Sequence, residues 1–375
     1  MARRLVALTE RSYQSANKTA LITDSHHGKT GADGQDGSYL CELLVGQGYT
    51  VHGLVRHHSE VHSQKPSRRM GTGAAVQHHY GDVLDPFSLI KILRLASPDE
   101  VYHLAAQSHV GLSFSTSSYT SDVDALGTLR VLEAIVALGM EKRVRFYNAC
   151  SSEVFGDVKE RVQNENTPFN PRSPYAVSKL YSYYTTVNFR DQGVFAVNGI
   201  LFNHESPRRG MDFVTRKISR AVALIHHGRR CVLTLGNLNS YRDWGHARDY
   251  VRGMWLMMQQ PEPEDFVLAT GETHSVRKFV EEAFRMIGID IEWRGKGVSE
   301  VGVDASTGRL LVQTDPALYR PLDVGYLHGS PQKAKEVLGW KPEITFQQLV
   351  REMVMADIRA LEDGSDLRAI EGPQL

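Results

Sequence analysis

The chain has 375 residues, and its 43 lysines and arginines are balanced by 43 aspartates and glutamates. This balance argues against a protein that binds nucleic acid, because displacing counterions from phosphates needs a basic excess. Hydrophobic residues make up 41% and charged residues 23%, so a folded core is expected and wholesale disorder is not. The length predicts about two domains, or one domain with an elaborate second lobe.

The sequence gives no sign of a membrane segment, an oxidising compartment or a metal site. No uncharged apolar run approaches the roughly 18 residues that span a bilayer. The only apolar stretch in the first 18 residues, Leu5 to Leu8, is too short for a signal-peptide core. The cysteines are too few for a disulfide framework, and the histidine doublets chelate poorly because neighbouring strand residues point to opposite faces. We therefore expect a cytoplasmic protein without a metal.

The first half of the chain alternates short apolar runs with segments of helical period. Strands are predicted at Thr19–Thr23, Tyr49–Arg56, Val76–Gly81, Glu100–Ala105, Val144–Ala149 and Ala196–Phe202. Helices are predicted at Ser38–Gln47, Pro86–Ala96, Thr120–Leu138 and Ser173–Arg190. This alternation predicts an α/β fold, with a Rossmann-like parallel sheet and helices on both faces.

The pattern loosens after Phe202, where a smaller C-terminal α/β substrate lobe is predicted. Its helices are expected at Phe213–His227, His246–Gln259, Ser275–Ile287, Pro331–Leu338 and Thr345–Leu361, and short strands at Val232–Leu235 and Phe266–Ala269. We expect mobile tails at 1–18 and 363–375, a nucleotide-binding domain at 19–202, and a lobe at 203–362 that is interleaved with sheet elements.

A glycine motif, Gly31-Ala-Asp-Gly34-Gln-Asp-Gly37, lies between the first strand and the first helix. Glycines let the backbone approach a pyrophosphate, and the helix N-terminus supplies free N–H groups. An earlier register, Gly28 to Gly34, is also possible. The segment 24–30 is unusual for such a motif, because the first glycine normally follows the strand directly.

The second strand ends in Arg56 and His57, with no acidic residue at its tip. An acid there would accept from the ribose 2′-OH of NAD, whereas a cation suits the 2′-phosphate of NADP. The tip is therefore compatible with NADP, and a solvated basic loop is the alternative.

A second motif, Tyr175-Ala-Val-Ser-Lys179, opens the helix that follows the fifth strand. The spacing places both side chains on one helix face, where the ammonium is expected to lower the tyrosine pKa and make it a usable base. Ser151 and Glu153 follow the strand Val144–Ala149, at the sheet edge where ligands bind. Cys150 is expected to be a small buried residue rather than a nucleophile.

Together these features resemble the extended short-chain dehydrogenase/reductases, and among them the GDP-mannose 4,6-dehydratases. The resemblance runs from about Thr19 to about Arg359. The segments that carry it are Gly34–Leu40, Leu104–Val110, Asn170–Tyr175, Val197–Gly210, Phe213–Ile218 and Arg242–Ala247. It implies Ser151, Glu153, Tyr175 and Lys179 as catalytic residues, with Ser151 standing where the family often has Thr.

The resemblance also implies binding residues. Cofactor contacts would come from Gly31, Gly34, Gln35, Asp36, Gly37, Arg56, Asp82, Val83, Leu104, Ala105, Ala106, Gln107, Ser108, Tyr119, Lys179, His204 and Arg209. Substrate contacts would come from Asn203, Lys217, Arg242, Arg320 and Asp323, the last standing where the family usually has Glu.

The implied activity is the dehydration of GDP-mannose to GDP-4-keto-6-deoxymannose by internal hydride transfer through NADP, in a homodimer or homotetramer. Glu153 would distinguish dehydration from 4-epimerisation, which needs no base at C5. Two alternatives stay open: another nucleotide-sugar 4,6-dehydratase or 4-reductase, and an inactive NADP- or nucleotide-sugar-binding protein whose phosphate loop is spoiled by 24–30.

Overall fold

The computed structural model describes residues 18–23, 34–56, 75–229, 231–319, 322 and 324–364. Some predicted features therefore lie outside the described residues. These are Gly31, the segment 24–30, His57, Arg320, Asp323 and most of the two predicted tails.

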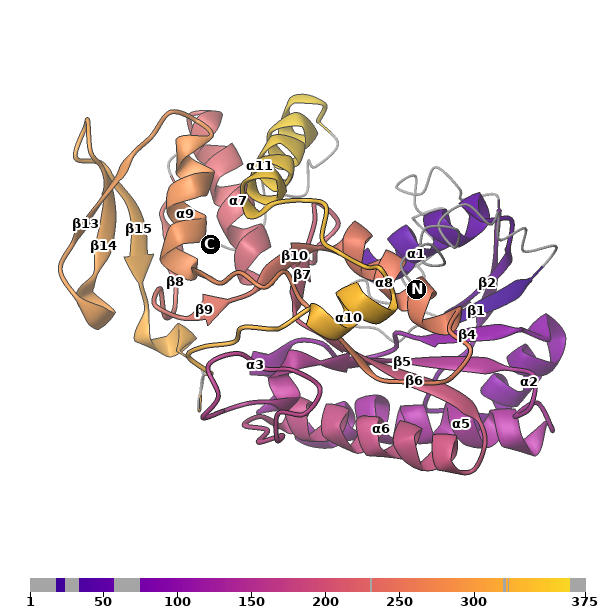
Figure 1. The fold of residues 1–375 in the computed structure, drawn as a ribbon. Coiled ribbons are helices and arrows are strands. Elements are labelled where there is room, and N and C mark those ends of the chain that lie inside the picture. The colour runs from indigo at the N-terminus through magenta and orange to yellow at the C-terminus, as the bar shows by residue number, and fades with distance from the viewer. Residues whose placement is uncertain are drawn as a thin grey trace, which may run out of the picture.

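Seven parallel strands form the central sheet (Figure 1). They are β1 (Thr19–Thr23), β2 (Thr50–Val55), β3 (Val76–Tyr80), β4 (Glu100–His103), β5 (Arg145–Ser151), β6 (Phe195–Leu201) and β11 (Phe266–Leu268), in the order β11-β6-β5-β4-β1-β2-β3. The chain moves outward from β1 to β3 and then returns to β4 on the other side of β1. This reversal is where ligands bind in open α/β sheets, and the predicted Rossmann-like fold is confirmed.

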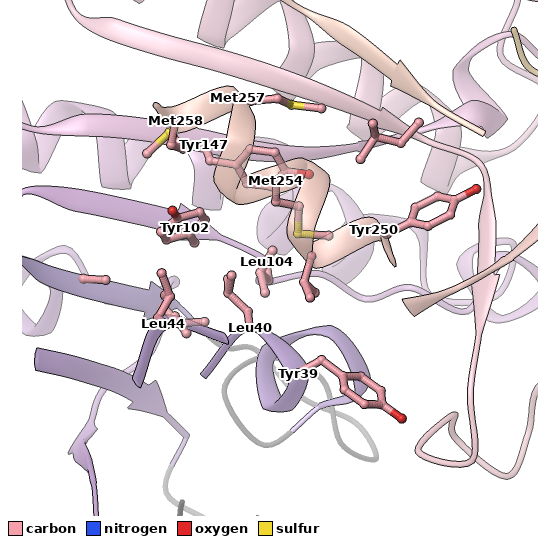
Figure 2. Close-up of a cluster of buried hydrophobic side chains, with 14 of the residues drawn as sticks. Tyr39, Leu40, Leu44, Tyr102, Leu104, Tyr147, Tyr250, Met254, Met257 and Met258 are labelled. Carbon is pink, nitrogen blue, oxygen red and sulfur yellow. The ribbon is translucent and has the colours of Figure 1, made fainter. Parts of the chain in front are cut away.

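Helices cover both faces of the sheet (Figure 1). One face carries α1 (Gln35–Gly46), α8 (Ala247–Met258) and α10 (Gln332–Val337), and the other carries α2 (Pro86–Ala96), α5 (Gly127–Ala137) and α6 (Pro174–Asp191). Figure 2 shows Met254 and Met257 of α8 near Tyr147 of β5, and Leu40 and Leu44 of α1 in the same apolar cluster. Burying each such side chain stabilises the fold by about 1.5–3 kcal/mol.

Helix α1 begins at Gln35, three residues before the predicted start at Ser38. Gly34 is the N-cap, its backbone is extended, and its carbonyl accepts the first helical bond from Ser38 N at 3.0 Å. The free N–H groups of the helix therefore belong to the glycine motif itself, where an anion is favoured.

The predicted helix 120–138 consists of three segments. These are α4 (Ser117–Ser121), a π-helical turn η3 (Asp122–Leu126) and α5, and a short α3 (Val110–Ser113) precedes them. A π-helical turn inserts one extra residue into a helix and is frequent at functional sites.

The C-terminal lobe packs α7 (Val214–His226), α9 (Val276–Arg285) and α11 (Phe346–Glu362) around a second apolar cluster. Its sheet contains β13 (Ile291–Arg294), β14 (Val301–Asp304), β15 (Leu310–Thr314) and β8 (Leu233–Leu235). Two strand pairs connect the lobe to the main sheet: β7 (Asn203–Glu205) with β10 (Trp244–His246), and β9 (Tyr241–Arg242) with β12 (His274–Ser275). Three short 3₁₀ turns complete the elements: η4 (Ser152–Val154), η5 (Gly297–Ser299) and η6 (Pro316–Leu318).

Among the helices of the described ranges, none combines the length and the apolar character needed to cross a bilayer.

Candidate active site

The hydroxyl and the carboxylate predicted to be catalytic lie in one turn at the carboxyl end of β5. The strand extends through Ser151, two residues beyond the predicted end, and the chain then enters η4. Ser151 Oγ accepts the backbone N–H of Glu153 at 3.2 Å. Both side chains are half-buried, so they can meet a substrate while the turn holds their backbone.

Gly156 closes this turn and has no room for a side chain. Its φ of +58° lies in the left-handed region, and a Cβ atom there would come within 1.8 Å of Asn170 O. Asn170 N in turn donates to Val154 O at 3.0 Å. The close approach of these two segments fixes where Glu153 sits.

Tyr175 and Lys179 occupy the first two turns of α6. Ser173 caps the helix by accepting from Ala176 N at 3.1 Å, and Pro174 begins it. Lys179 Nζ donates to Ala149 O of β5 at 3.0 Å and lies 5.9 Å from the centre of the Tyr175 ring. The lysine therefore ties the helix to the strand that presents Ser151, and the four predicted catalytic residues are brought together.

The pKa of Tyr175 is raised, not lowered as predicted. Burial is the largest cause, and the charges of Asp124 and Glu153 add to it, while a hydrogen bond with Ser151 opposes the shift. The prediction considered only Lys179 and was wrong because a buried phenolate loses its hydration and faces carboxylates.

The N-terminal turn of α1 is bonded to the strand β7. Gln35 Nε2 donates to His204 O at 2.9 Å, and Ser206 Oγ donates to Gln35 Oε1 at 2.8 Å. His204 Nε2 lies 2.8 Å from Asp36 Oδ2. Burial alone would raise the Asp36 pKa and lower that of His204, but their mutual attraction reverses both shifts. The predicted cofactor residues Gln35, Asp36 and His204 thus form one network.

Arg209 lies beside this network. Its guanidinium stacks on the Phe213 ring, 3.6 Å from the ring centre, and its Nε is 3.2 Å from Glu205 Oε2. Its charge also contributes to the lowered pKa of Asp36. A predicted phosphate-binding cation is therefore held at the glycine motif.

A second predicted group meets at the carboxyl ends of β2 and β3. Arg56 Nε is 3.3 Å from Asp82 Oδ2, and Arg56 Nη1 donates to Tyr119 Oη at 2.7 Å. Val83 is buried next to Asp82 and packs near Gly127. These residues therefore lie together at the carboxyl edge of the sheet, which is the edge where nucleotides bind in open α/β folds.

The segment Leu104–Ser108 follows β4 along the same edge. Leu104, Ala105, Ala106 and Gln107 are buried, and Ser108 is half-buried. Gln107 N donates to Asp124 Oδ1 at 2.6 Å, and Gln107 Nε2 donates to Thr120 Oγ1 at 3.0 Å. This loop is therefore held against the π-helical turn η3.

Three of the five predicted substrate residues lie in the described ranges. Asn203 on β7 pairs with Trp244 on β10, and Arg242 ends β9, two residues before Trp244. Arg242 is buried and its Nη1 donates to Tyr241 O at 2.9 Å. Lys217 lies in the first turn of α7 and is half-buried.

Several buried polar atoms at this edge have no hydrogen-bond partner among the described residues: Asn203 Oδ1, Asp124 Oδ2 and His103 Nε2. Buried groups in proteins normally have partners. Donors and acceptors of this kind, beside the N-terminus of α1, fit a bound nucleotide with phosphates and hydroxyls.

Sequence reasoning missed Asp124 and His103. His103 ends β4, its Nδ1 lies 2.8 Å from Thr23 Oγ1, and burial beside Lys179 lowers its pKa to about 3. Asp124 was detectable as a carboxylate within the apolar stripe of the predicted helix 120–138. Cys150 is buried, as predicted, and burial raises the pKa of its thiol to about 12, so it is a poor nucleophile.

Comparison with a family model and with curated relatives gives the same family. The family model described as GDP-mannose 4,6 dehydratase matches residues 30–353. A Drosophila melanogaster protein named GDP-mannose 4,6 dehydratase is 51% identical over 353 residues, 92% of this chain and 88% of that protein. A Sinorhizobium fredii protein named GDP-mannose 4,6-dehydratase is 53% identical over 349 residues, 92% of this chain and 97% of that protein.

Solved structures share the fold at lower identity. The UDP-glucose 4-epimerase of Thermotoga maritima, solved with UDP-glucose, has a TM-score of 0.73 and 22% identity, covering 92% of this chain and 99% of its own. The RMD protein of Pseudomonas aeruginosa, complexed with NADPH, has a TM-score of 0.69 and 23% identity, covering 91% and 99%. At these identities the likeness shows the fold alone.

Proposed function

The chain belongs to the GDP-mannose 4,6 dehydratase family, and from this membership we propose that it converts GDP-mannose to GDP-4-keto-6-deoxymannose and water with NADP as cofactor. The observation that carries the proposal is the position of Glu153. It shares a turn with Ser151, and its charge reaches Tyr175. An acid/base carboxylate beside a Ser–Tyr–Lys set suits dehydration, whereas 4-epimerisation needs no base at C5.

NADP, when bound, accepts a hydride from C4 of the sugar and later supplies one to C6. The residues proposed to hold its phosphates are the N–H groups of the glycine motif and Arg209, with Gln35, Asp36 and His204 fixing their positions. The residues proposed along its length are Arg56, Asp82, Val83, Tyr119, Lys179 and the segment Leu104–Ser108. Asn203, Lys217, Arg242, Arg320 and Asp323 are proposed for the nucleotide sugar.

Tyr175 is the proposed base for the first step. Its oxygen takes the proton of the sugar 4-hydroxyl as C4 becomes a ketone, and Ser151 donates a hydrogen bond to the same oxygen. Burial holds Tyr175 in its neutral form. The positive charge of Lys179, buried one helical turn away, is therefore needed to stabilise the phenolate.

Glu153 is proposed to carry the second step. The 4-ketone acidifies the proton on C5, and the Glu153 carboxylate removes it. The electron pair left on C5 forms a double bond to C6 as the 6-hydroxyl leaves, and Glu153 returns a proton to that hydroxyl so that it departs as water. Tyr175 then supplies the proton that C5 needs when C6 is reduced, and no net change in cofactor results.

NADP is proposed over NAD because the tip of β2 carries Arg56 and no acid. The carboxylate next to Arg56 comes from Asp82, after β3, and not from the tip that faces a ribose 2′-OH in NAD enzymes. Arg56→Ala is expected to weaken NADP binding about tenfold and to leave NAD binding nearly unchanged, measured by fluorescence titration. Equal losses of affinity for NADP and NAD would count against the proposal that Arg56 selects NADP.

The direct test is incubation with GDP-mannose and NADP, with product mass as the readout. A product lighter than the substrate by one water is expected from GDP-mannose, and little product from a UDP- or dTDP-sugar in parallel. Conversion of another nucleotide sugar in preference would point to a different 4,6-dehydratase. Failure to bind NADP would support the alternative of an inactive protein whose phosphate loop is spoiled by the segment 24–30.

A homodimer through α5 and α6 is part of the proposal. These helices carry large apolar side chains on their outer face, with Val177 54% exposed and Tyr184 57% exposed. Leu129, Leu180 and Tyr181 line a shallow hollow beside them. Tyr184→Glu is expected to shift the mass in solution toward a monomer by light scattering. Tyr80→Glu, at a similarly exposed tyrosine that ends β3, is the control and should leave the mass unchanged.

A further inference from the structure

Asp124 is a fully buried carboxylate in the π-helical turn η3. Its Oδ1 accepts the backbone N–H of Gln107 at 2.6 Å, whereas Oδ2 has no partner among the described residues. An ionised carboxylate that is buried with half of its acceptors unused is costly, so a carboxyl group in this position tends to keep its proton.

The turn η3 packs directly against α6. Ser121, at the end of α4, and Ser178 of α6 bring their hydroxyl oxygens within 3.2 Å of each other. Asp124 lies one helical turn after Ser121, and Lys179 directly follows Ser178. The charge of the buried Lys179 ammonium therefore opposes the rise that burial causes in the pKa of Asp124, and the charge of an ionised Asp124 raises the pKa of Tyr175.

The titratable groups around Tyr175 come from four elements. Lys179 lies on α6, Asp124 on η3, Cys150 on β5 and Glu153 on η4. His103 also faces Lys179 and is neutral, because its pKa is lowered to about 3. Burial raises the pKa of Asp124 to about 7, against the attraction of Lys179. Asp124 is thus the group in this set that changes charge near neutrality.

We propose that Asp124 is a positioning residue that sets the charge around Tyr175. While Asp124 holds its proton, the positive charge of Lys179 acts fully on the tyrosine. Once Asp124 ionises, its negative charge offsets that of Lys179 and opposes the phenolate. This inference rests on the proposed function, because that function gives Tyr175 the role of base.

The test compares Asp124→Asn with the wild-type chain over a pH range. Asparagine keeps an oxygen for Gln107 N and removes the ionisation. The ratio of kcat values, variant over wild type, is expected to be near one at about pH 6 and to rise about tenfold by about pH 9. A ratio that does not change with pH would overturn the proposal. Asp122→Asn, in the same turn but with a side chain 44% exposed, is the control and should show a constant ratio.

A readout that does not depend on activity comes from infrared difference spectra between about pH 6 and about pH 9. The wild-type chain should lose the band of a buried carboxylic acid as pH rises, and Asp124→Asn should lack this change. Absence of the band from the wild type would also overturn the proposal. If Asp124→Asn does not fold, Asp124→Ser removes the same charge and is judged by the same ratio. Failure of the proposed function would instead appear as no dehydration by the wild-type chain at any pH.

Discussion

The two ends of the central sheet bury their polar groups in different ways. At the amino end, Glu100 accepts from Lys18 Nζ at 2.9 Å, from Tyr49 Oη at 3.1 Å and from Tyr102 Oη at 2.7 Å, and Gln259 completes the set. At the carboxyl end, Asp124 Oδ2, His103 Nε2 and Asn203 Oδ1 are buried without partners among the described residues. The amino end satisfies its buried polar groups in one network, whereas the carboxyl end leaves some of them unpaired, as is common near functional sites.

The largest expected effect falls on the carboxyl end. Glu153→Gln removes the proposed C5 base and should slow dehydration by about 10³-fold, with some oxidation of the sugar at C4 still detectable as NADPH absorbance. The free energy of unfolding should change by less than about 1 kcal/mol, because the side chain is half-buried. Glu262→Gln, at an exposed loop carboxylate, is the matched control. Dehydration by Glu153→Gln at the wild-type rate would show that Glu153 is not the C5 base.

The opposite result is expected at the amino end. Glu100→Ala removes the acceptor of two buried tyrosine hydroxyls and one of the two acceptors of the Lys18 ammonium, which keeps Gln259 Oε1 at 3.0 Å. The loss should be about 3 kcal/mol in the free energy of unfolding, measured by denaturant titration, with kcat of the folded variant near the wild-type value. Glu262→Ala should cost less than about 0.5 kcal/mol. A large fall in kcat for Glu100→Ala would break the distinction between the two ends.

Asp124 predicts how stability depends on pH at the carboxyl end. Its pKa is about 7 in the folded chain and ordinary in the unfolded chain, so the stability it contributes is present at acid pH and lost as pH rises through about 7. Asp124→Asn has no such loss. Between about pH 5 and about pH 8, the free energy of unfolding of Asp124→Asn should rise by about 2 kcal/mol relative to that of the wild type, measured by denaturant titration at each pH. The same difference for Asp122→Asn should not change with pH.

Gly156→Ala is expected to have the smallest effect on activity among these changes at the carboxyl end, together with a moderate loss of stability. A Cβ atom would meet Asn170 O and the backbone would have to leave a φ of +58°, at a cost of about 1–2 kcal/mol. The turn that carries Glu153 would shift, so dehydration should fall about tenfold as well. Gly46→Ala, where nothing lies within 4 Å, is the control for both readings. Unchanged kinetics for Gly156→Ala would show that the turn does not position Glu153.

Local pattern was enough to predict the strands of the main sheet from β1 to β6 and the helices α2 and α6. Helix α2 has its predicted bounds because Asp85 caps it and Pro86 begins it, and both signals are local. That the four proposed catalytic residues lie close together was also predictable, since Tyr175 and Lys179 are one helical turn apart and Ser151 ends a strand at the carboxyl edge of the sheet.

Features that depend on distant contacts were not predictable. The Asp36–His204 pair joins the first helix to β7, and the raised pKa of Tyr175 reflects burial and the charge of Asp124. The π-helical turn η3 has no local signature that separates it from an ordinary helix. The strands β13 to β15 are short, and their pairing is decided by the lobe that packs on them.

The central claim is that the carboxyl end of the sheet carries out an internal oxidation, water loss and reduction in one site. Incubation of GDP-mannose deuterated at C4 with the full-length chain and NADP tests it most directly. We predict that the deuterium appears in the C6 methyl group of the product, seen by mass and by NMR, without net formation of NADPH. Loss of the label to solvent, or its recovery in released NADPH, would contradict the claim.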